Sequence, residues 1–130
     1  MDKFEKIAEL LKKKHTIIDT GVLKDKHTEV LNNLELGLIN DRAFSIVFLE
    51  KDVYRPPHIH DTSRAEFYFL EGNGLVLLDG KEIPFEKGTY LEVPAGSAHG
   101  FRIFEDTLFL SIQDGGGILK QDKTIDFRYE

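Results

Sequence analysis

From Leu34 onward the chain consists of short strand-like runs separated by turn residues, with no room for helices between them. The predicted strands are residues 34–39, 43–49, 75–78, 81–85, 89–93, 100–104 and 107–113. Asn40-Asp41-Arg42 predicts a hairpin turn between the first two, and Asp79-Gly80 is a turn dipeptide suited to a two-residue hairpin. An open sheet of this size would leave long unpaired edges, so the pattern indicates an all-β antiparallel domain closed into a sandwich or barrel.

The two ends of the chain have different patterns. Between residues 2 and 14, Phe4, Ile7, Ala8 and Leu11 recur at spacings of three and four, which predicts a short amphipathic N-terminal α-helix. Its basic end suits a helix C-terminus, and we expect it to pack, for example in a dimer. We therefore expect residues 1–33 to be a helix and lead-in segment, and residues 34–130 to be the β-barrel of one domain.

The chain continues beyond these strands through a glycine run. Residues 115–117 are three glycines, but neither a helix nor the residues of a phosphate loop follow, which favours a flexible connector. Residues 124–129 are predicted to form a last edge strand.

Composition excludes several classes of function. The net charge of -6, with both signs interspersed, offers no basic stripe for nucleic acid. The absence of cysteine excludes disulfides, thiolate ligands and cysteine nucleophiles. No apolar run is long enough to span a bilayer and no secretory segment begins the chain, so we expect a cytoplasmic protein.

Three histidines are the candidate functional residues. His58 and His60 lie two residues apart after Pro56-Pro57, and in an extended segment this spacing places both imidazoles on one face. The prolines cannot donate hydrogen bonds in a central ladder, so the segment is expected at a barrel rim. His99 follows a Pro-x-Gly turn. A single inward histidine is typical of a core, whereas three that converge would form a metal site.

The region from residue 56 to residue 104 resembles the cupin superfamily, whose members are small jelly-roll barrels built as a double-stranded β-helix. The second cupin motif matches as Gly88-x5-Pro94-x-Gly96-x2-His99. The first motif matches at His58 and His60 but departs afterwards.

The departure concerns the carboxylate of the first motif. The position that would hold the family's metal-ligating Glu is Ala65, and Glu66 is displaced by one residue. Because strand side chains alternate, this displacement turns Glu66 away from the histidines unless a bulge re-aims it. Glu66 is therefore either a fourth ligand beside His58, His60 and His99 or an exposed strand carboxylate.

The resemblance implies a divalent metal, with Fe, Mn, Ni, Cu and Zn all suited to imidazole ligands. Three-histidine sites resemble those of thiol dioxygenases and some carbon–carbon-cleaving dioxygenases, and sites with an added Glu resemble those of sugar isomerases, oxalate-processing enzymes and lyases. The leading interpretation is a metal-binding cupin that acts on a small-molecule substrate as a dioxygenase, isomerase or lyase, possessing no membrane partner and forming a homodimer. The alternatives are a non-catalytic ligand-binding or sensory cupin and a purely structural barrel.

Other side chains are candidates for roles beside the metal. If His99 faces inward, Phe101 and Ile103 share its face and make that wall apolar. Tyr68 and Tyr90 could act as acids or bases or simply pack. The remaining candidates are Arg64 and Arg55 as substrate anchors and Asp61 as a hydrogen-bond acceptor for a ligand imidazole.

Overall fold

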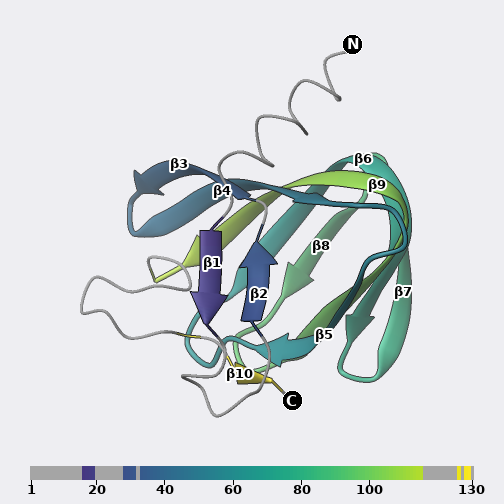
Figure 1. Cartoon of the computed structure of the whole chain (residues 1–130). Coiled ribbons are helices and arrows are strands. Elements are labelled where there is room, and N and C mark those ends of the chain that lie inside the picture. The colour runs from purple at the N-terminus through teal and green to yellow at the C-terminus, as the bar shows by residue number, and fades with distance from the viewer. Residues whose placement is uncertain (1–15, 20–27, 32, 116–125, 127, 130) are drawn as a thin grey trace.

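The structure of the chain is a computed structural model that describes residues 16–19, 28–31, 33–115, 126 and 128–129 (Figure 1). The helix predicted for residues 2–14 lies outside these residues. The strands are β1 (Thr16–Asp19), β2 (Thr28–Leu31), β3 (Asn33–Ile39), β4 (Arg42–Leu49), β5 (Tyr54–Ile59), β6 (Ala65–Leu78), β7 (Lys81–Glu86), β8 (Tyr90–Val93), β9 (Ala98–Asp114) and β10 (Arg128–Tyr129).

The strands form two antiparallel sheets. β1 pairs with β2, and the other strands form one sheet in which β10, β5, β9, β4 and β3 are neighbours in that order. The long strand β6 pairs with β9, β8 and β7 in turn. Figure 1 shows these strands curving around a common interior, with β10 beside β5. The predicted all-β fold is thereby confirmed.

Alternating side chains build the interior. In β6, Ala65, Phe67 and Phe69 are buried, whereas Tyr68 and Leu70 between them are exposed. Five of the ten phenylalanines belong to one buried cluster, so aromatic rings supply much of the apolar surface of the interior. The cluster comprises Leu49, Ala65, Phe67, Phe69, Val76, Phe85, Val93, Phe101, Ile103 and Phe109. This continuous core includes residues of β9, the strand that carries His99.

The predicted hairpins are confirmed, with small changes in their boundaries. Asn40 and Asp41 have φ angles of 51° and 62°, so the β3–β4 turn has two residues and Arg42 already belongs to β4. Asp79 and Gly80 form the β6–β7 turn.

The last predicted strands differ more from the structure. Residues 100–104 and 107–113 form the single strand β9, because Glu105 stays in the ladder opposite Asn73. The described part of the last edge strand is β10, which pairs with β5. No helix within the described residues is long and apolar enough to cross a membrane.

Candidate metal centre

A bulge in β5 places His58 opposite His99. Arg55 pairs with Phe101 and His58 pairs with His99, so the register shifts between them at Pro56-Pro57. Gly100 faces this bulge, and a Cβ atom built there would lie 2.4 Å from the backbone oxygen of Arg55. The two prolines and the missing side chain of Gly100 therefore allow β5 and β9 to approach closely at the histidines.

A backbone hydrogen bond links the segment of His60 to the turn before His99. The amide of Gly96, in the Pro-x-Gly turn before His99, donates a hydrogen bond of 2.9 Å to the backbone oxygen of His60. The turn needs glycine there because the φ angle of Gly96 is 83°. Asp79 also supports this region, because its carboxylate accepts a hydrogen bond of 2.8 Å from the amide of Ala98. Residues far apart in sequence thus bring the three imidazoles together.

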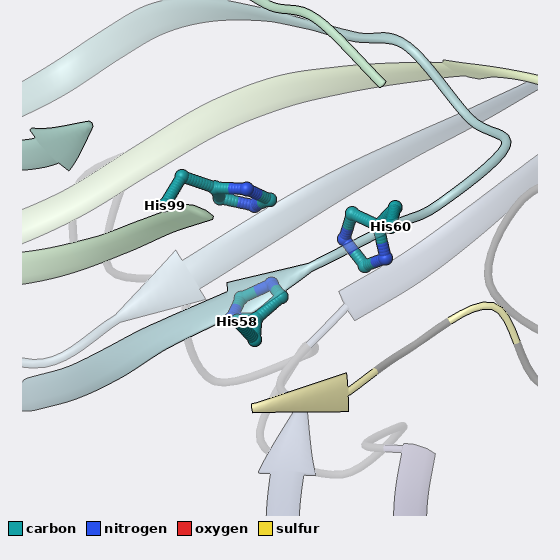
Figure 2. Close-up of side chains that lie close together, drawn as sticks. All are labelled: His58, His60 and His99. Atoms are coloured by element: carbon teal, nitrogen blue, oxygen red, sulfur yellow. The ribbon is translucent and has the colours of Figure 1, made fainter. Parts of the chain in front are cut away.

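The three histidines form one buried cluster. Figure 2 shows the rings of His58, His60 and His99 gathered at one point, and their potential ligand atoms all lie within 4.8 Å of one another. The exposed fractions of the three residues are 8%, 3% and 2% respectively. Within the part of the chain that the structure describes, this is the group of side chains that could hold a metal ion.

The electrostatics of the cluster keep imidazole in its ligating form. Burial, followed by the neighbouring His99 and His60, lowers the pKa of His58 well below its usual value. Burial and His60 lower the pKa of His99 to about 3. Both rings are therefore neutral at physiological pH, and neutral imidazole is the form that binds a metal. The three imidazoles converge from two strands and a loop, and this donor set fits a divalent transition-metal ion.

Comparison with known proteins establishes the family. The model of the cupin domain matches residues 45–112, just over half of the chain. The chain belongs to the cupin family. Its match to quercetin 2,3-dioxygenase of Bacillus subtilis is 39% identical over 46 residues, which span 35% of this cupin and 14% of that enzyme's length.

Solved structures agree on the fold. A Klebsiella pneumoniae protein with a double-stranded β-helix domain has a TM-score of 0.64 at 15% identity, covering 76% of this cupin and 83% of that chain. The DMSP lyase DddQ of Ruegeria pomeroyi has a TM-score of 0.60 at 20% identity, covering 65% of this cupin and 47% of that chain. Likeness at such identity supports the cupin architecture alone.

Glu66 is the predicted site residue that the structure does not bring to the histidines of this cupin. The pairing of β6 with β8 runs without a bulge from Ala65 to Tyr68, so Glu66 faces away from Ala65 and Phe67. Its carboxylate pairs with Arg42, lies 3.4 Å from Arg64, and accepts a hydrogen bond of 2.7 Å from Tyr90. The identity of the metal ligands remains a prediction. Because Glu66 lies in the outer network, the predicted ligands are the three histidines without a carboxylate.

Three of the other sequence candidates, Tyr68, Tyr90 and Arg64, also lie in this outer network, whereas Arg55 in β5 lies close enough to His58 that, besides burial, its charge lowers the pKa of that ring. The rings of Tyr68 and Tyr90 are 4.6 Å apart and both residues are exposed. The pKa of Tyr90 is raised, chiefly by its hydrogen bond to Glu92. Arg64 pairs with Glu92 at 2.8 Å. Tyr68, Tyr90 and Arg64 therefore stabilise the sheet surface, and nothing in their contacts places them at the histidines.

Two residues near the histidines were missed by the sequence analysis. Phe67 packs with its ring centroid 5.7 Å from that of His99, and the expected inward residue Phe101 lies at 6.2 Å. Asp126 accepts a hydrogen bond from the His60 ring through its backbone oxygen, the role expected of Asp61. Asp61 instead pairs with Arg128 at 2.9 Å. Strand alternation could have identified Phe67, whereas no local pattern marks Asp126.

An open cleft of about 590 Å³ lies elsewhere on the molecule. Its lining includes Gly72 and Asn73 in β6 together with four carboxylates and two lysines, and none of the three histidines lines it. Lys87 and Glu71 in this cleft form an ion pair of 3.4 Å. Its charged side chains, two of which form this exposed ion pair, make it a solvated surface rather than the candidate centre.

Proposed function

We propose that this cupin binds a divalent transition metal through His58, His60 and His99 and acts on a small molecule as a metal-dependent dioxygenase. The observation that supports the metal site is the convergence of three buried imidazoles within 4.8 Å. Three neutral ligands leave the two positive charges of the metal uncompensated. Such a centre favours small anionic molecules that can bind the metal through two atoms.

The chemistry of the surroundings favours an oxygen-dependent reaction over an isomerase or a lyase. Isomerases and lyases commonly need a side chain that moves a proton to or from the substrate. The described carboxylate expected at the site, Glu66, lies in the outer network, and the walls near His99 are the rings of Phe67 and Phe101. A metal such as Fe²⁺, when bound, supplies the ability to bring oxygen and a chelating substrate together.

The protein's own residues would then bind, orient and exclude water. His58, His60 and His99 would hold the metal, and a site with three protein ligands would leave it able to bind a substrate. Phe67 and Phe101 present apolar surface beside His99, which limits water near the reacting atoms. The partial match to a quercetin 2,3-dioxygenase is consistent with this reaction class, although it spans a small part of that enzyme.

An oxygen measurement tests this proposal. Protein loaded anaerobically with Fe²⁺ is mixed with pools of small thiols, keto acids and sugar derivatives, and oxygen consumption is recorded together with incorporation of labelled oxygen into products. We expect consumption with a chelating anion and both oxygen atoms in the product. Turnover that needs no oxygen would replace the dioxygenase proposal with an isomerase or lyase.

A non-catalytic ligand-binding cupin is the second candidate. Ala65, which is 1% exposed, stands where the family motif would place its Glu, and the site therefore has an apolar wall instead of a proton-transferring group. This candidate predicts saturable binding of a small molecule with no product under either aerobic or anaerobic conditions.

We also propose a homodimer. Leu36, Leu38 and Ile39 in β3 are 55%, 50% and 61% exposed. Among the described strands, β3 pairs with β4 alone and ends the order of its sheet. An exposed apolar edge is a typical site of self-association.

A further inference from the structure

The ring of His60 is oriented by a residue near the far end of the chain. Nδ1 of His60 lies 2.5 Å from the backbone oxygen of Asp126, and both residues are buried. A carbonyl oxygen can only accept a hydrogen bond, so Nδ1 carries the proton and donates it. In the neutral ring, which is the form that binds a metal, the lone pair is consequently on Nε2, and that atom is then the metal-binding one.

The side chain of Asp126 anchors its own carbonyl in that place. The carboxylate accepts hydrogen bonds from the amide of Asp61 at 2.6 Å and from the hydroxyl of Thr62 at 2.9 Å, and the amide of Thr62 lies 3.2 Å away. Asp126 thereby grips the loop that follows His60. Hydrogen bonds to a carboxylate from amides and a hydroxyl are among the stronger ones in proteins.

A second contact fastens the same segment to the metal-site strand. Arg128 and Tyr129 of β10 pair with Ile59 and His58 of β5. The guanidinium of Arg128 donates three hydrogen bonds to the carboxylate of Asp61, at 2.9, 3.0 and 3.1 Å. The contacts of Asp126 and Arg128 therefore converge on Asp61, which directly follows His60.

We propose that Asp126 is a positioning residue: its carboxylate fixes the chain end on residues 61–62 so that its backbone carbonyl holds the His60 imidazole with Nε2 directed to the metal. The inference rests on the proposed metal site. By this inference, Asp126, 66 residues away from His60 in the sequence, helps to set the orientation of the His60 ring. Hydrogen-bond partners of ligand histidines typically change metal affinity by 10–100-fold.

Two aspartates allow a matched comparison in the full-length protein. Asp126→Ala removes the anchor. Asp106→Ala removes an aspartate that accepts a hydrogen bond of 2.8 Å from the amide of Lys51 and lines the open cleft, which none of the three histidines lines. Zn²⁺ and Co²⁺ affinities are measured by competition with a chelator. We expect Asp126→Ala to weaken binding about 10–100-fold and Asp106→Ala to leave it within about twofold.

The tautomer of His60 is a readout that needs no metal. Long-range proton–nitrogen NMR of the metal-free protein should show His60 protonated at Nδ1 in the wild type and in Asp106→Ala, and a mixture of tautomers in Asp126→Ala. Asp126→Asn keeps one oxygen acceptor and should restore part of both properties. If the wild type binds no metal, the proposed function fails while the tautomer still tests the positioning role.

Two results would overturn the inference. One is a folded Asp126→Ala protein with wild-type metal affinity and an unchanged His60 tautomer. The other is an equal loss of affinity in Asp106→Ala, which would assign the effect to general destabilisation. If Asp126→Ala does not fold, the variant to measure is Asp126→Asn/Thr62→Val. It removes the negative charge and the hydroxyl bond and leaves one side-chain oxygen as acceptor for the Asp61 amide, so wild-type values for both readouts would reject the proposal.

Discussion

At the residue scale, burial decides the chemistry of the histidines. A surface histidine is half protonated near pH 6.5. Desolvation first, and then neighbouring imidazoles of the cluster, lower the pKa values of His58 and His99 and hold both rings neutral. The same burial that makes them good ligands makes them costly to protonate. At neutral pH the two rings therefore stay unprotonated, which is the form that can bind a metal ion.

This cost predicts how the stability of the metal-free protein depends on pH. The folded-state pKa values of His58 and His99 are below the unfolded value of 6.5, so below pH 6.5 the unfolded chain binds more protons than the folded one. Stability is complete above pH 6.5 and falls as pH decreases from there toward 3. Chemical denaturation should show a loss of about 2–3 kcal/mol between about pH 7 and pH 5.5.

The control for this prediction is the double variant His58→Asn/His99→Asn. Asparagine does not titrate, so its unfolding free energy should change much less over the same pH interval. An equal loss in the double variant would show that other groups cause the pH dependence.

Glu66 provides a second prediction at this scale. Glu66→Gln removes the charge that pairs with Arg42 but keeps the size of the side chain. Because its carboxylate faces the outer network, we expect the metal content measured by mass spectrometry to remain at the wild-type level. Stability should decrease by about 1 kcal/mol through the weakened ion pairs. Loss of the metal in Glu66→Gln would show that Glu66 is a metal ligand after all.

At the element scale, the bulge in β5 is the feature that brings the histidines together. Gly100 makes this bulge possible, because a Cβ atom would lie 2.4 Å from the Arg55 oxygen and 2.9 Å from the Pro57 nitrogen. These are backbone atoms of the strand that carries His58. A shift of these backbone atoms would also move His58, a predicted metal ligand.

Gly100→Ala should therefore destabilise the protein by about 1–3 kcal/mol and also weaken metal binding. Gly88→Ala is a suitable control, because Gly88 has a φ angle of 91° but open space around it. We expect the control to lose about 1 kcal/mol from backbone strain and to keep its metal affinity. If a folded Gly100→Ala protein kept its metal affinity, the close approach at the bulge would not be required for metal binding.

Local patterns in the sequence predicted those parts of the fold that depend on neighbouring residues. The turn at Asp79-Gly80 and the inward face shared by His99 and Phe101 follow from turn chemistry and strand alternation. Alternation also predicts that Glu66 faces outward once β6 runs without a bulge. The contact between Asp126 and His60 depends on tertiary pairing of β10 with β5, so no spacing in the sequence could predict it.

At the scale of the whole molecule, the barrel presents two different surfaces. The histidines are buried, on β5, on β9 and on the loop after β5, whereas β3 exposes Leu36, Leu38 and Ile39 at the end of a sheet. The interior is suited to a small ligand and the exposed edge to a second copy of the chain. The two proposed functions involve different parts of the fold and can be altered separately.

The edge predicts the assembly state. Leu38→Lys/Ile39→Lys places charges on β3, and sedimentation velocity should show a dimer for the wild type and a monomer for this variant. Metal content should be unchanged, because β3 carries none of the histidines. A wild-type protein that sediments as a monomer at high concentration would contradict the homodimer.

The most direct test of the central claim is the metal content of protein produced without a histidine tag, before and after reloading with Zn²⁺ or Fe²⁺. For the wild type we predict about one divalent ion per chain, because three imidazoles converge at one point. Replacement of two ligands in His58→Ala/His60→Ala should abolish binding, while Glu66→Gln retains it. Equal metal content in the wild type and the double histidine variant would contradict the claim that the histidine cluster is a metal site.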